Sequence, residues 1–128
     1  MTNFLIDEPF VFHSGRRLPF KIDADALTDA DLTTVARLVA RRLAFSTVLF
    51  IPRGGQRLAN ALLPYVTPGS LVTLIVDDVL TTGASMEELR DVLLAADRAV
   101  KVLGFVLFAR GPCPSWVTPF FTLHEVWR

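Results

Sequence analysis

Apolar and polar positions along the chain follow two spacings, one typical of strands and one typical of helices. Near the N-terminus, residues 9–13 and 19–23 are short, β-prone apolar runs on either side of the polar stretch Ser-Gly-Arg-Arg. Two such runs around a turn predict an N-terminal hairpin.

The first helix is predicted to begin at Thr28. Thr28 and Asp31 have the spacing of a capping box, and Asp29 and Asp31 place negative charge at the positive end of the helix dipole. The following apolar residues recur at helical spacing and form the predicted buried stripe: Leu32, Val35, Ala36, Val39 and Leu43.

Three further apolar runs predict strands, at residues 47–51, 71–76 and 100–109. The last two are unbroken, as is typical of strands buried on both faces of a parallel sheet. Helical segments follow the first two runs. A short helix is indicated by Leu58, Ala59, Leu62 and Leu63, and the predicted buried face of the next helix is formed by Met86, Leu89, Val92, Leu93 and Ala96. This order predicts an α/β domain with right-handed crossovers. The Pro- and aromatic-rich tail, residues 111–128, is expected to pack over one edge as a hood.

Length and charge narrow the classes of protein that remain. A chain of 128 residues fits a single domain, residues 1–128. Thirteen basic and thirteen acidic residues give no basic excess, which argues against a dedicated duplex nucleic-acid binder. No apolar run approaches the roughly 18 residues that span a bilayer, and the N-terminus does not resemble a signal peptide. Cys113 has no cysteine partner within the chain, so a reduced, cytoplasmic setting is expected.

Residues 77–85 carry the most specific candidate chemistry. They follow a predicted parallel strand and precede a predicted helix, at the edge of an open sheet where ligands bind. Backbone N–H groups at a helix start attract phosphate, Gly83 allows a close approach, and Thr81, Thr82 and Ser85 add hydroxyl donors. Asp77 and Asp78 suit a sugar diol, directly or through magnesium-bound water. In the alternative interpretation, Asp77 and Thr81 merely cap the helix.

Residues 74–85, which read Leu-Ile-Val-Asp-Asp-Val-Leu-Thr-Thr-Gly-Ala-Ser, closely resemble the motif with which type I phosphoribosyltransferases bind phosphoribosyl pyrophosphate (PRPP). The resemblance implies the parallel, helix-flanked fold of that family. It also implies that Asp77 and Asp78 act at the ribose and hold Mg²⁺ through water. The residues implied to bind the 5-phosphate are Thr81, Thr82, Gly83, Ala84 and Ser85.

Residues 51–55, Ile-Pro-Arg-Gly-Gly, resemble the pyrophosphate loop of the same family and lie at the expected place in the chain. By that likeness, Arg53, Gly54 and Gly55 would contact pyrophosphate. Taken alone, Pro-Arg-Gly-Gly is also a common turn sequence.

Residues 12–20 resemble the opening of orotate phosphoribosyltransferases, with three departures. His13 stands where that subfamily has lysine, Leu18 where it has serine, and Lys21 where an aromatic residue is usual. The candidate contacts to the base are Phe20, Lys21, Trp116, Phe120 and Phe121. For the aromatic residues of the tail, packing into the core is the alternative.

The interval between the two loops, residues 56–70, is shorter than in the family and lacks the long mobile catalytic loop. Its only basic residue is Arg57. Two functions therefore stay open: a transferase that joins 5-phosphoribosyl to a nitrogenous base, and a non-catalytic sensor of PRPP or a nucleotide monophosphate. The resemblance also allows a homodimer in which a second subunit supplies the missing part. The expected partners are PRPP and a base, without nucleic acid or membrane.

Overall fold

The computed structural model describes residues 5–6, 10–11, 17–18, 21–22 and 27–122. Its centre is a four-stranded sheet in the order β5-β6-β7-β8, and every neighbouring pair is parallel. The strands are β5 (Thr47–Phe50), β6 (Val72–Leu80), β7 (Lys101–Ala109) and β8 (Val117–Thr122).

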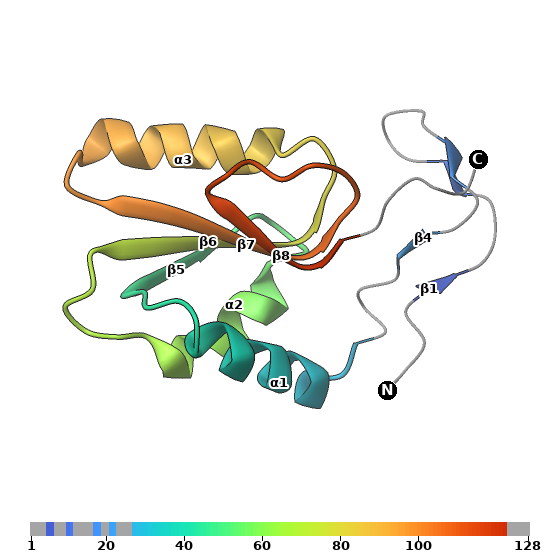
Figure 1. The fold of residues 1–128 in the computed structure, drawn as a ribbon, viewed down its shortest axis with the longest axis horizontal. Coiled ribbons are helices and arrows are strands. Elements are labelled where there is room, and N and C mark those ends of the chain that lie inside the picture. The colour runs from blue at the N-terminus through green and yellow to red at the C-terminus, as the bar shows by residue number, and fades with distance from the viewer. Residues whose placement is uncertain (1–4, 7–9, 12–16, 19–20, 23–26, 123–128) are drawn as a thin grey trace.

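Helices cover both faces of this sheet (Figure 1). One face carries α1 (Asp29–Ala40), α2 (Gln56–Leu62) and the short 3₁₀ helix η2 (Leu63–Tyr65), and the other carries α3 (Ala84–Ala96). The predicted α/β architecture, a parallel sheet flanked by helices, is confirmed.

The start of α1 is fixed by the predicted capping box. The Asp31 N–H donates to Thr28 Oγ1 at 3.1 Å, and the Thr28 N–H donates to Asp31 Oδ2 at 2.9 Å. Four of the five predicted stripe residues are buried: Leu32, Val35, Ala36 and Val39. Leu43, the fifth, lies after the helix and is partly buried against the same core.

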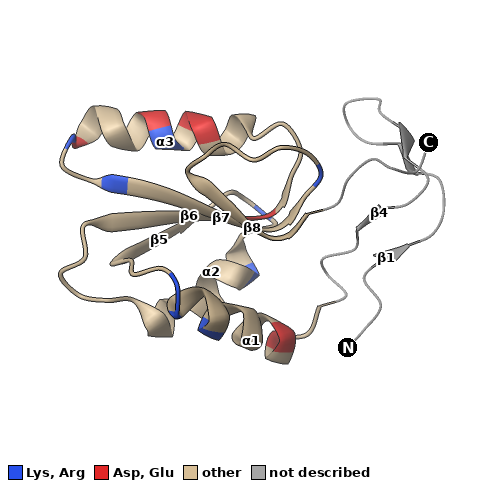
Figure 2. Ribbon diagram, viewed as in Figure 1, with Lys and Arg blue, Asp and Glu red and all other residues tan. Residues whose placement is uncertain are grey.

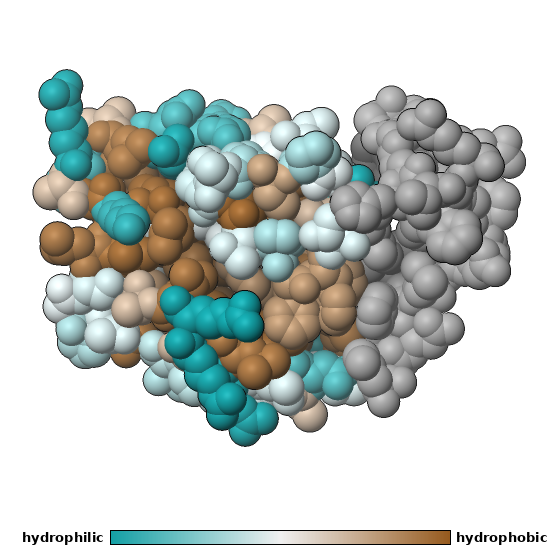
Figure 3. Space-filling view, in the orientation of Figure 1, coloured by the Kyte–Doolittle hydropathy of each residue, from teal (hydrophilic) through white to brown (hydrophobic). Residues whose placement is uncertain are grey.

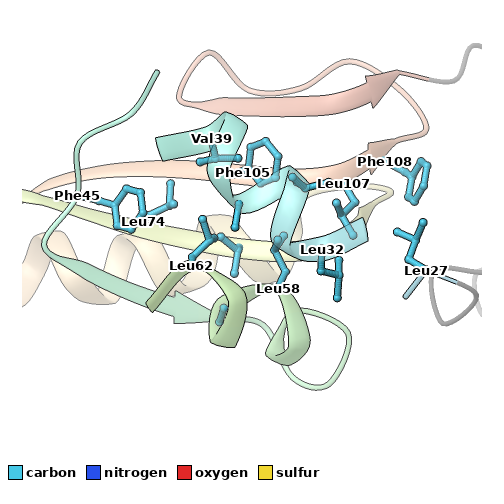
Figure 4. Packing of buried hydrophobic residues seen from close by; sticks show 14 residues of the cluster. Leu27, Leu32, Val39, Phe45, Leu58, Leu62, Leu74, Phe105, Leu107 and Phe108 are labelled. Atoms are coloured by element: carbon cyan, nitrogen blue, oxygen red, sulfur yellow. The ribbon is translucent and has the colours of Figure 1, made fainter. Parts of the chain in front are cut away.

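The core consists of two clusters, one on each face of the sheet. The larger cluster joins α1 and α2 to the sheet through side chains such as Phe45, Leu62 and Leu74, which interlock as Figure 4 shows. The smaller one lies under α3 and includes Ile75, Met86 and Val106. In α3, the prediction that Val92 and Ala96 are buried is wrong: both residues are exposed, and at this end of the helix Leu93 and Leu94 pack against the core instead.

Strand β6 is longer than its apolar run predicted. The strand was expected to end at Val76, but Asp77, Val79 and Leu80 pair in register with Val106, Phe108 and Ala109 of β7. Backbone hydrogen bonds to the neighbouring strand outweigh the low strand propensity of aspartate here. The acid pair therefore lies on the end of a strand and not in a loop.

The N-terminal antiparallel pairing also differs from the prediction. Strand β2 (Phe10–Val11) pairs with β3 (Arg17–Leu18), and β1 (Leu5–Ile6) pairs with β4 (Lys21–Ile22). Residues 19–23 were expected to pair with 9–13, so the hairpin was predicted correctly in kind but with the wrong partners. The additional strand β1 takes residues 21–22 as its partner and accounts for the shift.

The tail contributes a strand that the sequence did not predict. Residues 117–122 form β8, which lies parallel to β7 with Val117 opposite Gly104 and Thr122 opposite Ala109. The expected hood over one edge is corrected for these residues, since they extend the sheet itself. Residues 123–128 lie outside the described part of the chain.

Charges of both signs are interspersed over the helices, and the strands are largely uncharged (Figure 2). In the described part of the chain, no helix is long and apolar enough to cross a membrane.

Candidate functional site

The loops after β5 and β6 meet at the carboxyl edge of the sheet, because the two strands are parallel neighbours. The Ile51 N–H donates to the Val76 carbonyl at 3.0 Å and continues the strand pairing into the loop. A Cβ atom at Gly55 would lie 2.5 Å from the same carbonyl oxygen. The Pro-Arg-Gly-Gly loop is therefore packed directly against the end of β6.

Gly54 brings this loop against the acid pair. A Cβ atom at Gly54 would overlap the carboxyl group of Asp78, so only glycine allows the approach. The peptide bond between Pro52 and Arg53 is cis, and the Arg53 side chain is exposed. Two segments about 25 residues apart in the sequence thus form one surface at the sheet edge.

The two carboxylates are held by the backbone that follows them. The Asp78 N–H donates to Asp77 Oδ1 at 2.8 Å, and the Val79 N–H donates to Asp78 Oδ1 at 2.7 Å. Burial, together with the adjacent Asp78 carboxyl, raises the pKa of Asp77 from 3.8 to about 7. A partly buried pair of acids with one pKa near neutrality is typical of sites that bind cations or polar ligands.

Asp77 also lines a small hollow at the start of α3. The hollow has a volume of about 60 Å³ and is lined by Asp77, Val79, Leu80, Thr81, Thr82, Gly83, Ala84, Ser85 and Met86. It has room for about two water molecules at roughly 30 Å³ each. A hollow of this size can hold a small anion such as a phosphate group. All five residues predicted to bind phosphate are brought together here.

Gly83 shapes the floor of this hollow. Its φ of 79° is left-handed, which favours glycine, and it forms the N-cap of α3. The Ala84 N–H donates to Thr82 Oγ1 at 3.3 Å, and the Glu87 N–H to the Gly83 carbonyl at 3.0 Å. The first N–H groups of the helix have no acceptor within the helix, so they attract an anion.

The acid pair is the candidate magnesium site. Among the described residues, no three His, Cys, Asp or Glu side chains cluster closely enough to hold a metal ion directly. Two carboxylates suit Mg²⁺, which keeps several waters and shares its remaining positions with ligand phosphates. The donor set therefore fits a water-mediated magnesium ion better than a fully protein-bound one.

The aromatic candidates for base binding contact the protein itself. Phe121 stacks on Phe108 with ring centroids 5.3 Å apart, and Phe120 meets Phe105 edge-on at 6.3 Å. The Trp116 indole N–H donates to Glu87 Oε1 at 3.1 Å. Phe20 and the Lys21 side chain lie outside the described residues, as does His13.

The Arg57 side chain binds residues at the start of α1. Its guanidinium donates to the Leu27 carbonyl at 2.8 Å and to Asp29 Oδ1 at 3.1 Å, and so ties α2 to the start of α1. Residues 56–70 are occupied by α2, η2 and a turn. The one basic residue of the shortened interval is thus a structural link to α1.

Sequence reasoning missed Arg110, which directly follows β7. Arg110 is only 9% exposed, and its backbone N–H donates to the Leu80 carbonyl at 3.0 Å. This places a buried cationic residue at the carboxyl edge, one strand away from the acid pair. A charged residue directly after an unbroken apolar strand was the available signal, the same signal that identified Asp77.

A larger hollow of about 590 Å³ lies away from this edge, between the end of α1 and strands β7 and β8. It shares no lining residue with the hollow at Gly83. Its walls are mainly apolar: Leu38, Val39, Arg42, Leu43, Phe105, Thr118, Pro119 and Phe120. Size alone therefore does not identify the site, and the convergence of polar groups does.

The raised pKa of Asp77 predicts how stability depends on pH. The unfolded chain releases this proton near 3.8 and the folded chain near 7, so the free energy of unfolding falls as pH rises between these values. Asp77→Asn should remove this fall. The free energy of unfolding of the variant, relative to that of the parent, should therefore be about 1–2 kcal/mol higher at pH 8 than at pH 4; solvent screening of the partly exposed carboxyl keeps the effect this small. Urea denaturation of both proteins in chelator measures the difference, and identical pH profiles would contradict the assignment.

Comparison with solved structures identifies the fold, whereas no family model and no curated protein matches the chain. Among solved structures, an orotate phosphoribosyltransferase from Aeropyrum pernix is similar with a TM-score of 0.71 and 24% identity, over 93% of this chain and 88% of that one.

Two further structures are similar over most of the chain. An orotate phosphoribosyltransferase from Francisella tularensis matches with a TM-score of 0.59 and 20% identity, over 88% of this chain and 69% of that one. A hypothetical protein from Neisseria gonorrhoeae with bound ppGpp matches with a TM-score of 0.57 and 19% identity, over 79% and 84%. The chain therefore has the type I phosphoribosyltransferase fold and resembles the orotate phosphoribosyltransferases.

Proposed function

We propose that the chain binds PRPP with Mg²⁺ and transfers its 5-phosphoribosyl group to a nitrogenous base, releasing pyrophosphate. The observation that carries the proposal is the convergence of three elements at one sheet edge. Gly54 abuts the Asp78 carboxyl, and Asp77 lines the hollow at the start of α3. A phosphate site, a pair of acids and a glycine-rich loop with an arginine match the three parts of PRPP in order.

In this proposal the 5-phosphate occupies the hollow formed by Thr81 to Ser85, where hydroxyls and helix-start N–H groups donate to its oxygens. The ribose lies over the end of β6, and its hydroxyls donate to Asp77 and Asp78. The pyrophosphate extends over the loop at Gly54, beside the exposed Arg53. The spacing of these elements along the edge supports this order of contacts.

The carboxylates supply the electrostatic part of the reaction. As the bond between the anomeric carbon and the pyrophosphate oxygen breaks, positive charge develops on the ribose ring, and nearby ionised acids stabilise it. Arg53 offers positive charge to the departing oxygens. Magnesium, when bound, would neutralise pyrophosphate charge and so assist its departure. A ring nitrogen of the base then forms the new bond to the anomeric carbon.

The alternative is a non-catalytic protein of the same fold that senses PRPP or a nucleotide. Two observations favour it. Arg57 is tied to α1, and the similar structure of a hypothetical protein from Neisseria gonorrhoeae contains bound ppGpp. The coverage of the Aeropyrum pernix chain favours the enzyme. The match spans 88% of that orotate phosphoribosyltransferase, so a protein with this name can be nearly as short as the present chain.

Turnover and binding assays separate the two functions. With Mg²⁺ and PRPP, the enzyme should release pyrophosphate only when a base is added, and orotate, uracil, hypoxanthine and guanine are tried in turn. Calorimetry with PRPP, orotidine monophosphate and ppGpp measures binding in parallel. Binding of these ligands without pyrophosphate release would identify the sensor. The absence of both would reject both functions.

We propose a cytoplasmic homodimer as the working form. Large apolar side chains, among them Leu63, Leu71 and Val92, are exposed on the described part of the surface. Figure 3 shows hydrophobic residues gathered in patches on the face in view. Such patches are typical of surfaces that contact another protein. Light scattering coupled to size-exclusion chromatography tests the assembly, and a monomer at all accessible concentrations would reject it.

A further inference from the structure

The connection between β7 and β8, residues 110–116, runs along the side of the sheet that α3 covers. Cys113 and Trp116 of this segment pack against the smaller core cluster, which includes Met86 in the first turn of α3. The segment returns from the carboxyl edge to the level of Gly104, whose N–H donates to the Trp116 carbonyl at 2.8 Å. It thus follows α3 from its N-terminus inward.

Two contacts join this segment to the start of α3. A Cβ atom at Gly83 would lie 4.0 Å from Pro114 Cγ, so the proline reaches the phosphate loop. The Trp116 Nε1–H donates to Glu87 Oε1 at 3.1 Å. Glu87 belongs to the first turn of α3, and its own N–H closes that turn on the Gly83 carbonyl.

The indole ring is fixed on its other sides as well. A Cβ atom at Gly104 would lie 2.9 Å from Trp116 Cζ3, so the ring fills the space above the glycine. Arg90, one turn further along α3, lies over the ring with Cζ 5.1 Å from its centroid. A side chain packed in this way holds its N–H in one place, so Glu87 has a rigid donor to bind.

We propose that Trp116 is a positioning residue: its hydrogen bond to Glu87 fixes the first turn of α3 and thereby the N–H groups that bind the ligand phosphate. The inference rests on the proposed function, because it assigns an anion to that turn. It gives a role to an acid that lies close to a phosphate site. On charge alone, Glu87 would oppose the anion.

The charge of Glu87 makes the test sharp. If Glu87 acted only through its charge, Glu87→Ala would strengthen phosphate binding, because a nearby negative charge is removed. If it holds the helix start through Trp116, Glu87→Ala must weaken binding. The isosteric Glu87→Gln retains an oxygen acceptor without the charge and should bind as well as the parent or better. Glu88→Ala removes an equal charge from the next position and is the matched control.

Calorimetry with Mg²⁺ and PRPP, and separately with ribose 5-phosphate, measures these differences. Trp116→Phe, which keeps a ring over Gly104, and Glu87→Ala should each raise the dissociation constant about three- to tenfold, the effect of one hydrogen bond. Their double variant should lie within about twofold of the weaker single variant, since both remove one interaction. Unchanged or tighter binding by Glu87→Ala, or additive losses in the double variant, would overturn the inference.

Hydrogen exchange of the ligand-free proteins separates this inference from the proposed function. Trp116→Phe and Glu87→Ala should speed exchange at the amide of residue 87, which closes the first turn on the Gly83 carbonyl, about fivefold or more, while amides in the middle of β7 stay unchanged. Glu87→Gln should exchange like the parent. If exchange is faster in these variants but the protein binds no ribose phosphate, the proposed function is rejected and the positioning role of Trp116 stands. If the protein binds PRPP but all variants exchange equally, only the positioning role is rejected.

Discussion

Replacing both strand-end carboxylates, as Asp77→Asn with Asp78→Asn, is expected to weaken the binding of Mg²⁺-PRPP by a hundredfold or more. Hydrogen bonds to charged groups contribute about 1.5–3 kcal/mol each, so losing one at each carboxylate corresponds to factors of roughly 10² to 10⁴. The amides also lose the charge that attracts magnesium. Calorimetry gives the dissociation constants, and circular dichroism reports whether the double variant is folded.

Unfolding should not confuse this result. Burial raises the pKa of Asp77 to about 7, so a neutral side chain at this position is not expected to destabilise the fold above that pH. Asparagine at either position keeps an oxygen that can accept from the following backbone N–H. Glu88→Gln with Asp91→Asn, two exposed acids on α3, provides the matched loss of two negative charges. A folded double variant with the affinity of the parent would show that the ribose does not lie over the end of β6.

Gly54→Ala is expected to lower kcat/KM for PRPP by about thirtyfold to a hundredfold. The added methyl group would overlap the Asp78 carboxyl, so either the loop at Pro52–Gly55 moves or the carboxyl turns away. Displacements of about 1 Å at reacting groups can cost on the order of a hundredfold in rate. A coupled assay of pyrophosphate release measures the effect, and calorimetry with PRPP measures it if turnover is absent.

Gly111→Ala is the control for this change. Nothing lies within 4 Å of a Cβ atom at Gly111, and its backbone is not left-handed, so the same substitution meets open space. Ribose 5-phosphate, which lacks pyrophosphate, should lose less affinity to Gly54→Ala than PRPP does. Equal kinetics for Gly54→Ala and the parent would mean that the contact between the two loops has no part in substrate binding.

Local rules predicted those parts of the fold that depend on neighbouring residues. The capping box at Thr28 and Asp31 places the start of α1 correctly, and the unbroken apolar runs identify β6 and β7. The same rules failed where pairing with a strand distant in the sequence determines whether a segment forms a strand and where that strand ends. Hydrogen bonds to β7 extend β6 through Asp77, and β8 forms because residues 117–122 find the free edge of β7.

The candidate site divides in the same way. Its proposed phosphate part is continuous in the sequence, so one motif at Thr81 to Ser85 could indicate it, and these residues line a single hollow in the structure. Contacts between distant segments were not predictable from spacing. The apposition of Gly54 with Asp78 and the hydrogen bond from Trp116 to Glu87 both depend on how the strands are ordered in the sheet.

A crystal structure with PRPP and Mg²⁺ would show where the ligand binds. We expect the 5-phosphate on the N–H groups and hydroxyls of Thr81 to Ser85, with the ribose hydroxyls within hydrogen-bonding distance of the Asp77 and Asp78 carboxylates. Pyrophosphate should lie beside Gly54 and Arg53. Ligand density at another surface, with both the hollow and the acid pair empty at saturating PRPP, would mean that this sheet edge does not bind PRPP.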